Sequence, residues 1–186
     1  MPILSAKDNP PSKPFNSLIL ETEGTWWVAK TKPRQEKAFV FELSGQGIYY
    51  ALPCYEKKVR RSDGKFRKST LVLFPSYVPF ICEKPHSQLL KKERIAVILP
   101  VKVQEKFKKE LHALFLAQAA GAVIEPVPVE MPYQIGEPVE IISGPLSGLT
   151  GVVVDTRNET STVVLSIDGL GCAKVTMDLG MITSKL

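Results

Sequence analysis

The sequence predicts an α+β protein in which an antiparallel sheet flanked by helices is followed by a small β-barrel. Over residues 25–125, β-rich runs alternate with segments of helical periodicity, whereas after a proline-rich stretch only short β-rich segments remain. The charge divides at the same place, with a balance of +8 over residues 1–131 and −3 over residues 132–186. We therefore expect the following organisation: an N-terminal extension at 1–24 that is flexible, domains at 25–125 and 134–186, and a linker at 126–133.

The first domain opens with a strand and a helix. Residues 25–31 are rich in β-formers and predict the strand. Pro33 suits the first turn of a helix, and the apolar stripe of this helix consists of Phe39, Val40 and Leu43. Two glycines end the helix, and we expect residues 48–56 to form the next strand.

A basic hairpin and a second helix complete this domain. Asp63-Gly64 is a two-residue turn signal, and the return arm leads into a strand over 70–81. We expect a short helix over 86–93 and a short strand over 95–99. The clearest helix spans 104–120, where its apolar residues share one face and Gly121 stops it; an edge strand with prolines follows at 122–129.

The last 55 residues predict a barrel. Short strands are expected at 137–142, 151–156, 161–167 and 172–177, separated by turn residues. The glycines of 144–151 suit positive φ angles and a bulge. They lack the Lys-Ser/Thr ending of a phosphate-binding loop, which excludes nucleotide binding.

The composition excludes several classes of function. No apolar run approaches the roughly 18 residues of a membrane span, and no signal peptide is visible, so we expect a cytoplasmic protein. The three cysteines are widely spaced and suit free thiols. No metal-ligand spacing, nucleophile elbow or carboxylate pair is present, so we expect a non-enzymatic protein without cofactor or metal.

Three motifs, taken in their order along the chain, resemble the NusG family of transcription elongation factors. These motifs are Trp26-Trp27-Val28, Phe74-Pro75-Ser76-Tyr77-Val78 and Gly144-Pro145-x-x-Gly148-x-x-Gly151. The second is similar to the family's Phe-Pro-Gly/Asn-Tyr signature. The resemblance covers residues 25–186 and implies an NGN domain (an antiparallel sheet flanked by helices) followed by a KOW domain (an SH3-like barrel).

The resemblance implies that aromatic and apolar residues of the first domain dock on RNA polymerase, at the clamp helices of its largest subunit. The candidates for polymerase binding are Phe74, Pro75, Tyr77, Trp27, Tyr50 and Leu52. Phe74 and Tyr77 are three positions apart, so on a regular strand they face opposite sides, one in the core and one toward a partner. The alternative is a buried strand in which both rings belong to the core.

The basic hairpin and the segment after the first strand are the candidates for proximity to nucleic acid. They comprise Lys32, Arg34, Lys57, Lys58, Arg60, Arg61, Lys65, Arg67 and Lys68. So many cations would meet phosphates, with binding that weakens as salt rises. The resemblance implies DNA near the upstream fork or the non-template strand. A hairpin made basic to protect an edge is the alternative.

The resemblance also implies a mechanism: the NGN domain holds the polymerase clamp closed, which favours antitermination and processivity, and the KOW barrel recruits a second partner. The segment 31–37 resembles the specialised RfaH/UpxY-like paralogues more than the housekeeping factor of the family, which is the alternative. Leu146 and Leu149 lie in the loop that in this family meets Rho or the ribosome, and the acidic barrel disfavours Rho. We expect a monomer that does not bind membranes. The alternative function is an RNA- or ribosome-associated KOW protein without a polymerase role.

Overall fold

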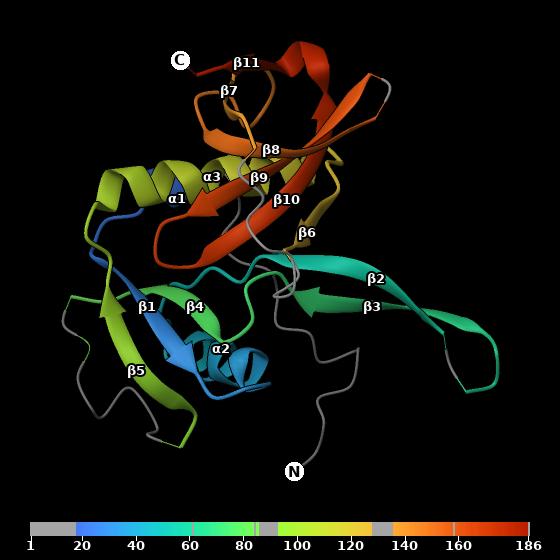
Figure 1. The fold of residues 1–186 in the computed structure, drawn as a ribbon. Coiled ribbons are helices and arrows are strands. Elements are labelled where there is room, and N and C mark those ends of the chain that lie inside the picture. The colour runs from blue at the N-terminus through green and yellow to red at the C-terminus, as the bar shows by residue number, and fades with distance from the viewer. Residues whose placement is uncertain are drawn as a thin grey trace. The chain divides into compact units, whose positions relative to one another are not determined.

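The computed structural model describes residues 18–60, 62–83, 85, 93–127, 136–157 and 159–185. Within these residues the chain forms two compact units. The first comprises the described residues from 23 to 102. The second comprises the described residues 18–22 together with the described residues from 103 onward. Figure 1 shows the elements of both units along the chain.

The first unit is built on a three-stranded antiparallel sheet of order β4-β1-β5. Its strands are β1 (Trp26–Thr31), β4 (Tyr77–Ile81) and β5 (Ile95–Pro100). Helix α2 (Glu36–Gly45) packs against β4. The core between them contains Ala29, Phe39, Val40, Leu43, Val78 and Phe80. Phe39 and Phe80 meet edge to face with ring centroids 6.1 Å apart, a geometry that aromatic pairs prefer.

A long hairpin extends from this unit (Figure 1). It consists of β2 (Cys54–Arg60) and β3 (Phe66–Val72), which form a two-stranded sheet of their own. The register runs from Cys54 opposite Val72 to Arg60 opposite Phe66. The turn is longer than the two residues that Asp63-Gly64 predicts, because Arg60 and Phe66 are the last paired residues. Gly64 does adopt a positive φ of 80° there.

The second unit contains a six-stranded antiparallel sheet of order β11-β7-β8-β9-β10-β6. Its elements are α1 (Leu18–Glu21), α3 (Gln104–Ala119), β6 (Ile124–Pro126), β7 (Pro138–Ile141), β8 (Thr150–Arg157), β9 (Thr160–Ile167), β10 (Gly171–Asp178), a 3₁₀ turn (Leu179–Met181) and β11 (Ile182–Ser184). Helix α3 packs against α1 and β9. Gly151 allows β8 and β9 to approach, since a Cβ there would lie 2.5 Å from Val163 Cγ1.

The predicted α+β class is confirmed, and most predicted elements are present. The predicted strand over 70–81 is wrong as one element, since a turn at 73–76 separates β3 from β4. The predicted strand over 48–56 begins later, at Cys54, and only Tyr50 forms an isolated bridge before it, to Phe80. Most of the predicted helix at 86–93 lies outside the described residues.

The segment between the two predicted domains pairs with the C-terminal strands. β6 aligns with β10, with Ile124 opposite Val175. The buried Glu110 of α3 accepts a hydrogen bond from the backbone N–H of Asp168, with Oε2 3.0 Å from the nitrogen. These contacts place α3 and β6 in the second unit. The domain boundaries at 25–125 and 134–186 stay a prediction, because contacts do not show which part of a chain folds alone.

Candidate binding surfaces

The turn that carries the Phe-Pro-Ser-Tyr motif is held by main-chain contacts. Ser76 adopts the left-handed conformation, with φ of 69°. Its N–H donates to Glu36 Oε1 at 2.7 Å, and its carbonyl accepts from the N–H of Thr31 at 2.8 Å. Glu36 is only 7% exposed, so this carboxylate is committed to the turn. The result is a fixed turn between β3 and β4 that connects the motif to α2 and β1.

Tyr77 and Lys30 lie together on one face of the sheet. They are directly opposite each other in the register of β1 and β4. Lys30 Nζ is 6.0 Å from the centroid of the Tyr77 ring, at the outer limit of a cation–π contact. Lys30 and Pro75 are exposed, and Tyr77 is half-buried. This surface of Tyr77, Lys30 and Pro75, here called the Tyr77 surface, is therefore open to a partner.

The other candidates for polymerase binding lie elsewhere. Trp27 pairs with Phe80 on the sheet face toward α2, opposite to the face of Tyr77, and its indole N–H donates to the carbonyl of Cys82 at 3.0 Å. Tyr50 and Leu52 are 3% and 2% exposed and belong to the α2 core. Burial raises the pKa of Tyr50, opposed in part by a hydrogen bond with Ser44.

Phe74 is also buried, at 3% exposure. Of the two rings that the motif offers, Phe74 is thus the core residue and Tyr77 the accessible one. In this conformation the buried candidates support the sheet from within, and only part of the predicted set shares a surface.

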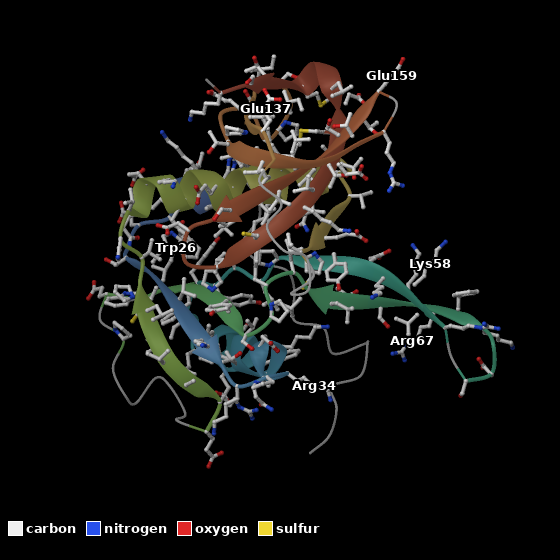
Figure 2. All side chains as sticks on the ribbon, viewed as in Figure 1. Trp26, Arg34, Lys58, Arg67, Glu137 and Glu159 are labelled. Carbon is white, nitrogen blue, oxygen red and sulfur yellow. The ribbon has the colours of Figure 1, made fainter. Side chains whose placement is uncertain are left out.

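The basic hairpin exposes its cations on both faces. Cross-strand partners share a face, so one face carries Lys58, Arg60 and Lys68, and the other carries Lys57 and Arg67. Figure 2 shows Lys58 and Arg67 pointing away from opposite sides of the hairpin. All five are exposed, as is Lys65 near the tip, whereas Arg61 lies outside the described residues.

The remaining cations lie between β1 and α2. Lys32 is exposed, and its backbone N–H donates to the carbonyl of Arg94 at 2.8 Å. Arg34, labelled in Figure 2, is exposed and has a positive φ of 63°. The next cation along the chain, Lys37 in α2, turns inward, because its Nζ donates to the carbonyl of Thr70 at 2.9 Å.

The loop between β7 and β8 presents its leucines unequally. Gly144 and Gly148 have φ of 79° and 85°, as the glycine pattern predicts. Leu146 is 4% exposed and belongs to the core of the second unit, and Leu149 is half-buried. Leu149 is therefore the more accessible of the two predicted partner residues.

Several exposed apolar residues of the described chain were not among the predicted site residues, and Phe66, Ile142 and Leu179 are examples. Phe66 is 71% exposed at the end of the hairpin, Ile142 is 54% exposed and Leu179 is 41% exposed. Ile142 is adjacent to the 3₁₀ turn through its N–H, which donates to the carbonyl of Met181. The alternation of Phe66 with basic residues was a usable signal, whereas nothing in the sequence marks Ile142 or Leu179 as exposed.

Residues 24–83 match the model of the family described as "NusG: Transcription termination factor nusG". The matched segment contains β1, α2, the hairpin and β4 with the Tyr77 turn. Over these 60 of its 186 residues, the chain is similar to the NusG family. The likeness to a family of transcription factors agrees with the sequence motifs.

Structural comparison agrees with the fold of that family. A structure described as domain interaction in Thermotoga maritima NusG is 20% identical, with a TM-score of 0.50, over 88% of this chain and 98% of that one. At this identity the likeness shows the fold. A second structure, the MjSpt4:Spt5 complex in conformation B, is 19% identical over 86% of this chain and 97% of that one, but its TM-score of 0.24 carries no argument. No curated protein matches the chain. No helix of the described residues is long and apolar enough to span a membrane.

Proposed function

We propose that this protein, which is similar to the NusG family over residues 24–83, acts as a transcription elongation factor. It would bind elongating RNA polymerase through the Tyr77 surface and modulate pausing and termination. The observation that carries the proposal is the pairing of an accessible aromatic ring with a cation on a fixed turn. Tyrosine rings dominate binding energy at many interfaces, and Lys30 adds a charge beside the ring. The partner surface would be the clamp helices of the largest subunit.

A factor that bridges the clamp would act by differential binding. It raises the free energy of an open or paused polymerase only if it binds the closed state more tightly. Tighter binding to the closed state would disfavour pausing and termination, so the protein would act as an antitermination and processivity factor. The resemblance of segment 31–37 to the RfaH/UpxY-like paralogues supports this role. The exposed cations of the hairpin, with Lys32 and Arg34, would lie near DNA of the upstream fork or the non-template strand.

The C-terminal strands would recruit a second partner. The half-buried Leu149 and the buried Leu146 lie in the loop where the family meets Rho or the ribosome. Tethering to the first unit raises the effective concentration of such a partner at the polymerase. The net charge of −3 over residues 132–186 disfavours direct RNA binding by this part.

Binding to core RNA polymerase from the same host tests the proposal. We expect wild type to bind and Tyr77→Ala to weaken binding by about 30-fold, which corresponds to about 2 kcal/mol at an interface centre. Tyr55→Ala is the matched control, since Tyr55 is also a half-buried tyrosine but belongs to the hairpin. Circular dichroism checks the fold of each variant.

Two results would reject the proposal. Binding of wild type to RNA or ribosomes, with none to polymerase, would favour the alternative of an RNA- or ribosome-associated KOW protein. Equal loss in Tyr77→Ala and Tyr55→Ala would show that the Tyr77 surface is not the docking site.

A further inference from the structure

The two faces of the β2–β3 hairpin differ in chemistry. The face that carries Lys58, Arg60 and Lys68 also carries Phe66, because Arg60 and Phe66 are cross-strand partners and Lys58 and Lys68 are partners two positions further along. The opposite face places Val59 beside its partner Arg67. Among the paired residues that the structure describes, the first face therefore combines three cations with an exposed aromatic ring, whereas the opposite face carries two cations, Lys57 and Arg67, and the half-buried Tyr55.

The charges on this face repel one another. Lys58 and Lys68 lie directly opposite, an arrangement that destabilises a strand pair. Glu56 lies on the same face, and its Oε2 is 3.0 Å from Lys68 Nζ. Both side chains are more than 60% exposed, and such a pair contributes little. A polyanion that bridges Lys58 and Lys68 would relieve this repulsion.

Among the described residues, Phe66 is the most exposed of the large apolar side chains, at 71%. A single exposed apolar residue is ordinary. What distinguishes Phe66 is its position in the hairpin. It lies opposite Arg60, and the next cross-strand pair on the same face is Lys58 with Lys68. Proteins that bind single-stranded nucleic acid combine aromatic rings and cations in this way. Bases inside a duplex are already stacked and do not offer a face to such a ring.

We propose that this face binds an unpaired nucleic-acid strand, with one base stacked on Phe66 and its phosphates near Lys58, Arg60 and Lys68. The inference rests on the proposed function, in which the hairpin lies near nucleic acid. It adds that the nucleic acid bound by the hairpin is single-stranded. Every base has a face to stack, so recognition is independent of sequence. The binding energy divides into a stacking part from Phe66 and an ionic part from the cations.

Oligonucleotide binding to the full chain separates these two parts. The probe is a fluorescently labelled single strand of about 12 nucleotides, as DNA and as RNA, with the corresponding DNA duplex as a third arm. We expect Phe66→Ala to weaken single-strand binding about tenfold without changing the dependence on salt. Lys58→Ala and Lys68→Ala should each lower the slope of log K against log salt by about 0.7, the value for one lost phosphate contact.

The hairpin supplies its own controls. Val59→Ala removes an exposed apolar side chain from the opposite face, and Arg67→Ala removes a cation from it. Val59→Ala should leave single-strand affinity unchanged, and Phe66→Tyr should retain it. Arg67→Ala should weaken binding through lost charge alone, with no change in stacking on Phe66. A fluorescent adenine analogue in the strand gives a direct readout, because its emission is quenched by stacking and should recover in Phe66→Ala.

Several outcomes overturn the inference. Equal effects of Phe66→Ala and Val59→Ala, or duplex binding as tight as single-strand binding, would remove the stacking role. Loss of polymerase binding in Phe66→Ala with unchanged oligonucleotide binding would make Phe66 a protein contact. If wild type binds polymerase but no single strand, the inference fails and the proposed function stands; single-strand binding without polymerase binding rejects the proposed function alone. Preference for RNA over DNA would identify the transcript rather than an exposed DNA strand as the ligand.

Discussion

At the scale of single residues, Ser76 determines how the motif is presented. It is one of two described non-glycine residues with positive φ, and the related motif of the family has glycine or asparagine at this place. A left-handed conformation costs an ordinary residue about 1–2 kcal/mol. That cost persists because Glu36 and Thr31 hold both main-chain groups of Ser76. Its outcome is the turn that separates the buried Phe74 from the accessible Tyr77.

Replacing Ser76 with glycine should therefore stabilise the protein. Glycine adopts this φ without strain but loses more backbone entropy on folding, about 0.5–1 kcal/mol. We expect Ser76→Gly to raise the free energy of unfolding by about 0.5 kcal/mol, the difference between these terms. Urea denaturation measures it. Ser69→Gly, in the middle of β3, should change stability in the opposite direction; a decrease in both variants would contradict the strain at Ser76.

Cys54 should be an unreactive thiol. Burial raises its pKa to about 11 from 9.0, although the charge of Lys37 opposes this. Alkylation requires the thiolate, so we expect the rate at Cys54 in the folded chain, followed by mass spectrometry, to keep rising up to about pH 11.

The same pKa difference makes stability depend on pH. The folded chain binds the proton of the Cys54 thiol more tightly than the unfolded chain does. The contribution of this thiol to the free energy of unfolding is therefore complete below pH 9.0 and is lost as pH rises through 11. In urea the alkylation profile should shift down toward pH 9.0; the same profile with and without urea would refute the effect of burial.

At the scale of secondary-structure elements, Arg94 joins the start of β5 to α2. Its Nε lies 2.7 Å from Glu42 Oε1, and its Nη1 donates to Gln35 Oε1 at 2.6 Å. Both members of the ion pair are less than one-third exposed. We expect Arg94→Ala to lower the free energy of unfolding by about 2 kcal/mol, as for hydrogen bonds to charged groups. Arg94→Lys should recover only part of the loss, because lysine lacks the planar fork of donors.

The same denaturation experiment has a control in the hairpin. Lys68 pairs with Glu56 in water, so Lys68→Ala should change stability by less than about 0.5 kcal/mol. A loss as large as that of Arg94→Ala would mean that exposure does not decide the strength of these pairs.

The sequence predicted element types better than it predicted which side chains are accessible. Periodicity identified α2, α3 and four strands of the barrel, because burial of one face imposes that pattern. It did not locate the turn at 73–76, where the interaction with Glu36 comes from 40 residues away. The sequence did not show which of Phe74 and Tyr77 is buried. Alternation along a strand indicates that the two side chains face opposite sides, but it does not indicate which side is covered by the core. The same limit explains Tyr50, Leu52 and Leu146, which are buried.

At the scale of the whole molecule, the two units divide the chemistry. The basic first unit carries the Tyr77 surface and the hairpin, and the C-terminal strands carry a net negative charge. Electrostatic attraction to polyanions is thus concentrated in one part of the chain. This division was predictable from composition, because charge, unlike burial, can be counted along the sequence.

The segment 103–127 packs with the C-terminal strands inside the second unit. It contributes the pairing of β6 with β10 and the hydrogen bond from Asp168 to Glu110. We expect a fragment of residues 103–186 to unfold with a free energy about 2 kcal/mol greater than one of residues 134–186, since the shorter fragment loses this bond and exposes the edge of β10. Chemical denaturation compares them, and Glu110→Ala in the longer fragment should remove part of the difference. If the two fragments are equally stable, while residues 25–125 are more stable than residues 25–102, then α3 and β6 belong energetically to the first domain, and the boundary expected from the sequence is the correct one.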